Sequence, residues 1–349
     1  MAKLFFLISG EYETLSFSEL KAILESEGFA YVVTEKLDQT VRVEADTSSI
    51  AHVLRRSAYT RTIAQELFTS DDTDEAITKA AETTNFHAVL QAGESFAVRI
   101  RRIKEYSTKS DTMRLESKLG KLILQHTTGT RVNLTKPDKT FFGILTNHKL
   151  IFGLRLAEIE PKPFVERRPR KKPFFHPSAM NAKLARCMVN LAHARVGAVV
   201  LDPFCGTGTT ILEAALIGCR AIGTDVQRRM AEGTRRNLQK FGAEPEAIML
   251  ADARRLPFSR VDAVVTDPPY GRSATTLKSS TRMLVVNVMS SAKPLLLVGQ
   301  RICIASPKTL HIAKIGEALG YKHVESHFAY VHRSLTREIA VFQKEADEA

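Results

Sequence analysis

The stretch LDPFCGTGTT, at residues 201–210, decides the fold class of this chain. A short apolar run ends at Asp202, two glycines follow at Gly206 and Gly208, and a helical pattern begins directly after them. A strand, a glycine-rich turn and a helix in this order are typical of a doubly wound α/β sheet, which binds its ligands at the carboxyl ends of its strands. The turn lacks the lysine of a phosphate-binding loop, and Ile211 stands where a dinucleotide motif has its third glycine. A nucleoside triphosphate and a dinucleotide are therefore not the expected ligands.

The rest of the C-terminal half repeats this alternation of strands and helices. Its strand segments are short apolar runs without polar alternation, which indicates strands covered on both faces and hence a mostly parallel sheet. Strands are expected at residues 198–201, 220–224, 247–250, 261–266, 301–305, 321–330 and 339–343.

Acidic residues follow the second and third of these strands. Asp225 lies 19 residues after Gly206, where an acid can accept hydrogen bonds from ribose hydroxyls, and Asp252 follows the third strand. Together with Asp202 they place three carboxylates at one edge of the sheet. This set suits S-adenosylmethionine, which carries an adenosine, an ammonium group and a cationic sulfonium, and whose carboxylate could bind at a helix N-terminus. For Asp225 alone, the N-cap of the next helix explains the residue equally well.

The fourth strand ends in DPPY at residues 267–270, which is the most specific motif of the chain. The exocyclic amine of a base is a poor nucleophile, because its lone pair is delocalised into the ring. An ionised Asp267 and the carbonyl of Pro268 would accept both amine hydrogens and aim the lone pair at a methyl donor, while Pro269 stiffens the turn. Tyr270 would stack on the base, as aromatic side chains do with extruded bases. A proline-rich turn explains the motif by itself, but not its place after a glycine turn and two acids.

Length and charge indicate two or three domains and a nucleic-acid partner. A chain of 349 residues is longer than one hydrophobic core usually accommodates. Its apolar and charged fractions, 44% and 25%, are those of a globular protein. The net charge of +12 is unevenly spread, because residues 101–200 carry 21 basic and 7 acidic residues whereas residues 1–100 carry 9 and 16. A localised basic field favours a polyanion partner over a merely solvated surface.

Two basic segments are expected to contact RNA. The segment SFAVRIRR, at residues 95–102, alternates apolar with basic residues, which predicts a half-buried strand that presents Arg99, Arg101 and Arg102. Residues 158–176, EIEPKPFVERRPRKKPFFH, hold four prolines and six basic residues and are expected to form a stiff linker between domains. The basic residues expected to bind RNA there are Arg167, Arg168, Arg170, Lys171 and Lys172.

The N-terminal part mixes strands with helices. Strands are expected at residues 4–8, 31–34, 41–44, 95–102, 140–145 and 150–155, and helices at 16–27, 49–57 and 111–126. The apolar start has no cleavage site, so we expect a buried strand rather than a secretion signal, and no run of 18 apolar residues predicts a membrane span. The four cysteines form no C-x-x-C pair, so no metal site is expected, and their low number fits the cytoplasm.

Together these motifs resemble a known family. The order DPFCGTG, GTD, ADA, DPPYG resembles that of the Rossmann-type, S-adenosylmethionine-dependent amino-methyltransferases. The segments PFFHPSAMNAKLARCMVNLA, at 173–192, and DPPYGRS, at 267–273, are similar to the archaeal-type tRNA guanosine N2-methyltransferases that modify position 10. FAVRIRR, LESKLGKLI and VNLTKPD resemble the THUMP domain of that family. One departure is Thr209, where many relatives have a further glycine.

The resemblance implies an α/β architecture of four parts. These are a ferredoxin-like module at residues 1–60, a THUMP RNA-binding domain at 61–157, the linker at 158–176 and a methyltransferase domain at 177–349. The last is a Rossmann-type doubly wound sheet with an antiparallel last strand. The implied protein is a cytoplasmic monomer that binds tRNA and methylates the N2 amine of a guanosine. Whether it adds one or two methyl groups stays open, as does its need for the small zinc-binding activator subunit that accompanies some relatives.

The resemblance also implies roles for individual residues. Asp202, Gly206 and Gly208 would line the methionine half of the cofactor, Asp225 would hold the ribose, and Asp252 would hold the adenine amine. The catalytic turn would consist of Asp267, Pro268, Pro269 and Tyr270, followed by Arg272 against a phosphate. The cofactor site would further include Phe175, His176, Ser178, Phe204, Val226, Ala253 and Asp267.

Two alternatives stay open at this point. The same chemistry could act on another tRNA guanosine, on adenine N6 of DNA or RNA, or on a glutamine amide of a protein, because related turns occur in those enzymes. The basic middle third argues against a protein substrate, and no long insertion after Asp267 indicates a DNA-reading domain. An RNA-binding protein on an inactive methyltransferase scaffold would show a broken motif, whereas the motifs here are whole.

Overall fold

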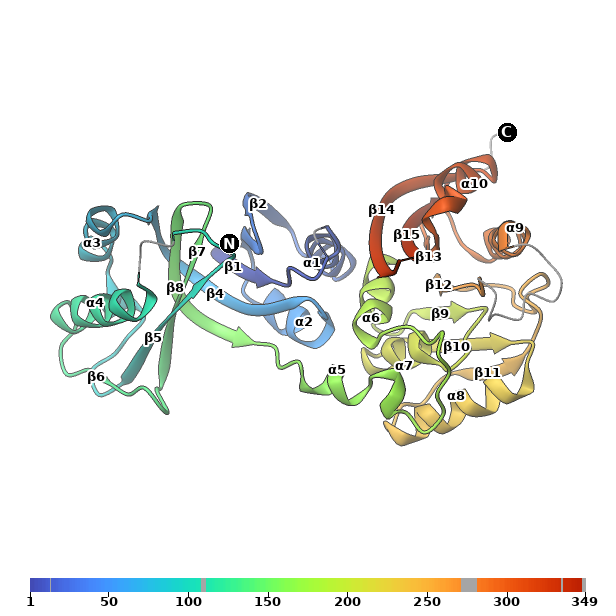
Figure 1. Cartoon of the computed structure of the whole chain (residues 1–349), viewed down its shortest axis with the longest axis horizontal. Helices are drawn as coiled ribbons and strands as arrows, with labels where there is room; N and C mark the ends of the chain where they lie inside the picture. The colour runs from blue at the N-terminus through green and yellow to red at the C-terminus, as the bar shows by residue number, and fades with distance from the viewer. Residues whose placement is uncertain (13, 108–110, 271–280, 334, 347–349) are drawn as a thin grey trace. The chain divides into compact units, whose positions relative to one another are not determined.

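The computed structural model describes residues 1–12, 14–107, 111–270, 281–333 and 335–346. The chain forms two compact units (Figure 1). The first unit consists of Met1–Glu11, Phe29–Leu54 and Thr60–Glu160, and the second unit consists of Tyr12–Gly28, Arg55–Tyr59 and Pro161–Ala349.

The first unit is built on one eight-stranded sheet in the order β2-β3-β1-β4-β8-β7-β5-β6. Strand β4 (Thr60–Asp71) pairs antiparallel with β1 (Ala2–Ile8) on one side and with β8 (Lys149–Glu158) on the other. The sheet therefore continues across residue 60, where a boundary between two modules was expected. The other elements are β2 (Tyr31–Leu37), β3 (Thr40–Ala45), α2 (Ser49–Arg56), α3 (Asp74–Glu82), β5 (Ser95–Arg102), α4 (Thr112–Gln125), β6 (Arg131–Val132) and β7 (Lys139–Thr146).

Strand β5 is the half-buried basic strand that the sequence predicts. It pairs parallel with β6 and with β7. Arg101 is exposed, whereas Arg99 and Arg102 are partly buried. Arg99 donates a hydrogen bond from Nη2 to the carbonyl of Leu134 at 2.6 Å, which fixes its guanidinium beside the strand.

The second unit contains the seven-stranded sheet β11-β10-β9-β12-β13-β15-β14 (Figure 1). The neighbours from β11 to β13 are parallel, and β15 is antiparallel to both β13 and β14, so the mostly parallel sheet with an antiparallel last strand is confirmed. The strands are β9 (Val199–Asp202), β10 (Arg220–Asp225), β11 (Ala247–Leu250), β12 (Ala263–Thr266), β13 (Arg301–Pro307), β14 (Tyr321–His332) and β15 (Leu335–Lys344). The helices are α1 (Leu15–Ser26), α5 (Lys162–Glu166), α6 (Ala182–Leu191), α7 (Thr209–Leu216), α8 (Arg228–Lys240), α9 (Thr281–Ala292) and α10 (Ile312–Ala318).

Helices cover both faces of this sheet. Successive residues of a strand point to opposite faces, so the apolar clusters to which they belong show which helices lie on each face. Val200 and Val265 belong to a buried apolar cluster with residues of α6, α7 and α8. Their chain neighbours Leu201 and Val264 belong to a second cluster with residues of α9 and α10. The two clusters are the two helical layers of a doubly wound fold.

Two segments from the N-terminal part of the chain belong to the second unit. These are helix α1 with its flanking residues and the segment Arg55–Tyr59. Leu15, Ala22 and Tyr59 lie in the same buried cluster as the residues of α6. The expected compact module at residues 1–60 is therefore corrected, since parts of it complete the core of the second unit.

The expected linker is also corrected. From Pro161 onwards the chain belongs to the second unit, where it forms α5 and a 3-10 turn at Pro169–Lys171. Prolines begin both short helices, and proline is tolerated there because the first turn has no partner for its backbone donors in any case. Pro161, Pro163 and Pro169 thus lie at the starts of helices, whereas Pro173 follows the 3-10 turn.

Among the residues that the structure describes, none of the helices has both the length and the apolar character required to cross a bilayer. Within the same ranges, no three His, Cys, Asp or Glu side chains gather as a metal site would need, and Cys187, Cys205, Cys219 and Cys303 are buried thiols.

Candidate active site

The glycine turn between β9 and α7 has a conformation that requires glycine. Gly206 and Gly208 have φ angles of 51° and 74°, in the left-handed region. A Cβ atom on Gly208 would lie 2.6 Å from Cγ2 of Thr234 in α8. Thr234 donates a hydrogen bond to the carbonyl of Gly206 at 2.9 Å, and Oδ2 of Asp225 accepts the Gly206 N–H at 3.2 Å. The turn is thus held by α8 and by the end of β10.

Asn237, a buried residue of α8, attaches a second segment to this turn. Its Nδ2 atom donates hydrogen bonds to the carbonyls of Phe174 at 2.9 Å and of Thr207 at 2.8 Å. Its Oδ1 atom accepts the Phe174 N–H at 2.9 Å. The chain that follows Phe174 therefore begins beside the glycine turn.

A pocket forms where the glycine turn, the segment before α6 and the end of β12 meet. Nδ1 of His176 and Oγ of Ser178 lie 2.7 Å apart at its edge. The predicted site residues that line it together are His176, Ser178, Asp202, Phe204, Gly206 and Asp267.

Asp202 is the buried carboxylate of this pocket. Its Oδ1 atom accepts hydrogen bonds from Oγ1 of Thr266 at 2.7 Å and from the Phe204 N–H at 3.1 Å. Burial raises the pKa of Asp202 to about 7, and the nearby carboxylate of Asp267 acts in the same direction. A cationic group bound in the pocket would stabilise the ionised form.

Among the residues that the structure describes, Asp267 is paired through one of its two oxygen atoms. Oδ2 lies 3.1 Å from Nη2 of Arg337 in β15, and Nε of Arg337 donates a hydrogen bond to the hydroxyl oxygen of Tyr270. Oδ1 is buried and has no hydrogen-bond partner among the described residues. Burial raises the pKa of Asp267, and the charge of Arg337 opposes that rise. A buried acceptor without a donor calls for a ligand that supplies one.

The other two residues of the motif differ in exposure. Pro268 is buried, and Pro269 is partly buried. The rest of the DPPYGRS segment, which includes Arg272, lies outside the described residues.

Asp252 lies outside this pocket and is already paired. Nε and Nη2 of Arg254 approach its Oδ2 atom to 2.9 Å and 2.5 Å, and this pairing lowers the pKa of Asp252. The other predicted cofactor residues that do not line the pocket are Phe175 and Val226, which are exposed, Ala253, which is buried, and Gly208 and Asp225, which shape the glycine turn.

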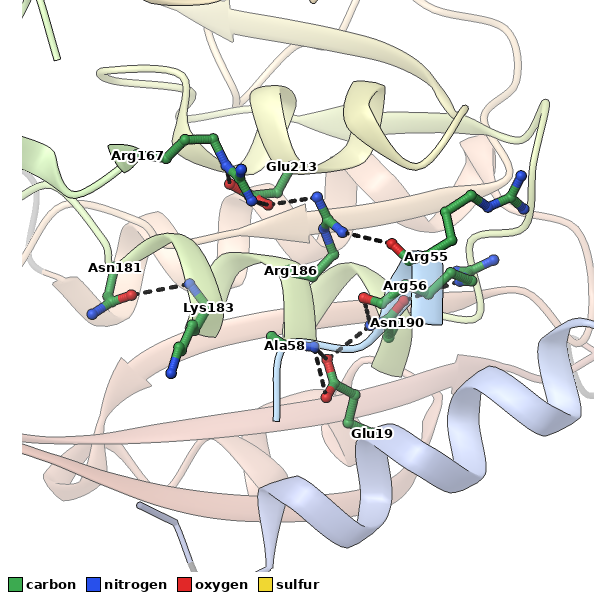
Figure 2. Close-up of polar contacts among 10 residues, drawn as sticks. All are labelled: Glu19, Arg55, Arg56, Ala58, Arg167, Asn181, Lys183, Arg186, Asn190 and Glu213. Atoms are coloured by element: carbon green, nitrogen blue, oxygen red, sulfur yellow. Dashed lines mark hydrogen bonds and ion pairs between the residues drawn. The ribbon is translucent and has the colours of Figure 1, made fainter. Parts of the chain in front are cut away.

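Two basic residues expected to bind RNA are buried within the second unit instead. Arg167 forms a two-pronged ion pair with Glu213 of α7, at 2.6 Å and 3.2 Å, and Arg186 of α6 pairs with the same carboxylate at 2.7 Å (Figure 2). Nζ of Lys172 donates a hydrogen bond to Oγ1 of Thr209 at 2.7 Å. The RNA-binding roles of Arg167 and Lys172 are corrected, because both side chains are occupied in the interior. Arg168, Arg170 and Lys171 are exposed, and Lys171 pairs with Glu166 at 2.9 Å.

Sequence reasoning missed Arg337, Thr234 and Asn237. None of them lies in or next to a motif, and each reaches the site through the packing of its element. For the buried side chains of Arg167 and Lys172, the sequence did contain one signal. Glu213 stands in the apolar helix α7, where an acid requires a buried partner.

Comparisons with known proteins identify the family. A family model described as "RMKL-like, methyltransferase domain" matches residues 169–339, and one described as "DNA methylase" matches residues 56–236, which end before Asp267. The tRNA (guanine(10)-N2)-dimethyltransferase of Methanothermobacter thermautotrophicus is 39% identical over 97% of this chain and 98% of its own length. The chain belongs to the tRNA (guanine(10)-N2)-dimethyltransferase family.

A second member of this family, from Methanocaldococcus jannaschii, is 30% identical over 97% of this chain and 99% of its own length. The crystal structure of TrmN from Thermus thermophilus is 22% identical, covers 98% of this chain and 99% of that chain, and has a TM-score of 0.56. That likeness confirms the fold.

Proposed function

We propose that this protein transfers methyl groups from S-adenosylmethionine to the exocyclic N2 amine of guanosine 10 in tRNA. The observation that carries the proposal is the buried Oδ1 atom of Asp267, which has no hydrogen-bond partner in the part of the chain that the structure describes and which shares a pocket with Asp202 and the glycine turn. The amine of guanine supplies the hydrogen-bond donor that this oxygen lacks. The named function of the relatives supports tRNA as the carrier of that guanosine.

Asp267 and Pro268 prepare the amine for methylation in this proposal. Oδ1 of Asp267 and the carbonyl of Pro268 accept the two amine hydrogens, so that the nitrogen lone pair points out of the base plane. Oδ1 also receives the proton that the nitrogen loses after methylation, and the raised pKa of Asp267 suits that step. Tyr270 stacks on the base.

The glycine turn and the acids around it hold the cofactor. When bound, S-adenosylmethionine supplies an electrophilic methyl group on its sulfonium. Asp202 faces its cationic ammonium, and Asp225, at the end of β10, faces the ribose. His176 and Ser178 close the pocket near the methionine half. Asp252 would have to exchange its ion pair with Arg254 for the adenine amine.

Exposed and partly buried basic residues bind the tRNA phosphates in this proposal. They are Arg99, Arg101 and Arg102 on β5 and Arg168, Arg170 and Lys171 in the segment before α6, with Arg272 as a further candidate from the sequence. We further propose that the protein acts as a cytoplasmic monomer, with or without a zinc-binding activator subunit.

Mass spectrometry of nucleosides tests the function. Unmodified tRNA is incubated with the protein and S-adenosylmethionine, digested, and compared with a transcript in which guanosine 10 is replaced by adenosine. N2-methylguanosine or N2,N2-dimethylguanosine should form only in the first transcript, and the ratio of the two shows how many methyl groups are added. A duplex DNA arm covers the adenine N6 alternative. N6-methyladenine in that arm, with no methylguanosine in tRNA, would refute the proposal.

A further inference from the structure

We propose that Arg337 is a positioning residue for the methyl transfer, which bridges Asp267 and Tyr270 and leaves one oxygen of Asp267 for the substrate amine. This inference rests on the proposed function. It assigns a role to a residue 70 positions after Asp267 that belongs to no motif of the chain.

The topology of the sheet brings Arg337 to the site. Parallel strands end at one edge of the sheet, and β12 reaches that edge at Thr266, opposite Ile304 of β13. Strand β15 runs antiparallel to β13, so it enters at this edge and pairs Arg337 with Pro307. Arg337 therefore stands level with the residues that follow β12, which are those of the DPPY turn.

The contacts of Arg337 give the two oxygen atoms of the Asp267 carboxylate different surroundings. Nη2 lies 3.1 Å from Oδ2, whereas Oδ1 is buried and lacks a partner among the described residues. A planar guanidinium can hold a carboxylate in one orientation while its other nitrogen atoms bind elsewhere. Here Nε donates to the hydroxyl oxygen of Tyr270, and the guanidinium carbon lies 5.7 Å from the Tyr270 ring centre. Both ends of the turn are thus fixed by one side chain.

The charge of Arg337 also keeps Asp267 able to accept. The side chains of Asp267 and Arg337 are 17% and 11% exposed, so water screens neither of them well. Among the described residues, the charged or titratable groups that face this pair are Tyr270 from the turn, Asp202 from β9 and Tyr12 from the segment before α1. Arg337 is the cation of this set, and it offsets the cost of an ionised Asp267.

Single-turnover kinetics at saturating tRNA and S-adenosylmethionine test the role. Arg337→Gln should lower the methyl-transfer rate about 100-fold, the cost of a reacting group displaced by roughly 1 Å, while both substrate affinities stay near those of the wild type. The acidic limb of the pH–rate profile should move up by about one to three units, because Asp267 loses an adjacent cation. In an Asp267→Asn background, which has no carboxylate to position, the same substitution should change the rate little.

Two further variants keep the test decisive. Arg220→Gln is the matched control, because Arg220 pairs with Glu246 at 2.6 Å at the opposite edge of the sheet, and it should behave as the wild type. Arg337→Lys keeps the charge without the two-sided grip, so its rate should fall about tenfold while its acidic limb stays in place. If Arg337→Gln does not fold, the rate and the pH profile of Arg337→Lys test the proposal.

Wild-type rates in both Arg337 variants would overturn the proposal. So would a lower rate with an unmoved pH profile in Arg337→Gln, or losses that simply add to those of Asp267→Asn. A wild-type protein that leaves tRNA unmethylated refutes the proposed function instead, before any variant is compared.

Discussion

Nζ of Lys172 lies 2.7 Å from Oγ1 of Thr209, and both side chains are buried. Thr209 directly follows Gly208 of the glycine turn and is the first residue of α7. Here its hydroxyl connects the turn to the basic segment that precedes α6. Burial lowers the pKa of Lys172 to about 8, a shift that Glu213 opposes.

Lys172 should make stability depend on pH above neutrality. The folded protein releases this proton near pH 8, whereas the unfolded chain keeps it until about pH 10.4. Since the unfolded state binds more protons between these values, Lys172 should add about 2 kcal/mol to the free energy of unfolding from pH 7 to pH 9.5. In thermal melts, the melting temperature of the wild type should therefore rise relative to that of Lys172→Met as the pH rises. A gap that stays constant with pH would contradict this expectation.

Gly208→Ala should weaken cofactor binding. The left-handed φ of 74° costs an alanine about 1–2 kcal/mol, and its Cβ would press on Thr234. Because the turn must shift, the dissociation constant for S-adenosylmethionine should rise about tenfold or more in calorimetry. Gly242→Ala is the control, since Gly242 has a φ of 61° with open space around it. Equal effects of the two substitutions on cofactor affinity would argue against the role of the turn.

Binding of S-adenosylmethionine should release protons from Asp202. Near pH 6.5 this carboxyl is largely protonated, because burial raises its pKa to about 7. A bound ammonium lowers that pKa again, so up to about one proton should leave on binding. Calorimetry in buffers of different protonation enthalpy measures the number. Asp202→Asn should reduce it, and an unchanged number would place the cationic end of the cofactor elsewhere.

Removal of residues 1–160 should unfold the remainder rather than yield an isolated methyltransferase domain. Helix α1 and the segment Arg55–Tyr59 belong to the second unit, and Glu19 of α1 is fully buried there. Glu19 accepts hydrogen bonds from the N–H group of Ala58 and, at 2.9 Å, from Nδ2 of Asn190 (Figure 2). It also accepts the N–H of Tyr59. A truncated chain leaves Asn190 and the α6 core exposed, and it should show no cooperative melt in circular dichroism.

A single substitution examines the same network in the full chain. Glu19→Ala leaves several buried donors unpaired, so the free energy of unfolding should fall by about 3 kcal/mol or more. Glu232→Ala, which removes an exposed i,i+4 pair with Arg228, should have little effect. If the truncated protein melts cooperatively and Glu19→Ala is harmless, these segments are dispensable.

Arg168 and Arg170 should contribute to tRNA affinity in a salt-dependent way, whereas Arg167 should not. The first two are exposed, and the third is buried against Glu213. Neutralising Arg168 and Arg170 together should flatten the dependence of log affinity on log salt by about one to two units, because fewer counterions are released. Arg167→Gln should leave that slope unchanged and lower the melting temperature. The opposite assignment of the two effects would refute this division.

Local motifs made much of the second unit predictable from sequence. Strand β9, the glycine turn and the end of β12 each carry their chemistry within about ten consecutive residues, so Asp202 and Asp267 could be named. In the first unit, β4 and α3 were not expected, since their apolar residues are sparse and their burial comes from neighbouring elements. Arg337 and Asn237 depend on strand register and helix packing, which no short pattern encodes. Arg167 and Lys172 were misassigned because charge alone indicates exposure, whereas α7 supplies partners for both.

The path of the chain between the two units has a consequence for biosynthesis. Leu15 and Ala22 of α1 leave the ribosome long before the residues of α6 that share their cluster. At about 5–20 residues per second, translation takes roughly 10 to 30 s to bridge that interval. During this time the apolar face of α1 lacks the α6 residues that pack against it in the folded protein. The second unit therefore cannot fold step by step from its own N-terminus during translation. The same cluster includes Ile339 and Val341 of β15, so its final assembly must wait until the nascent chain is almost complete. We therefore expect α1 to be a point where a chaperone would act.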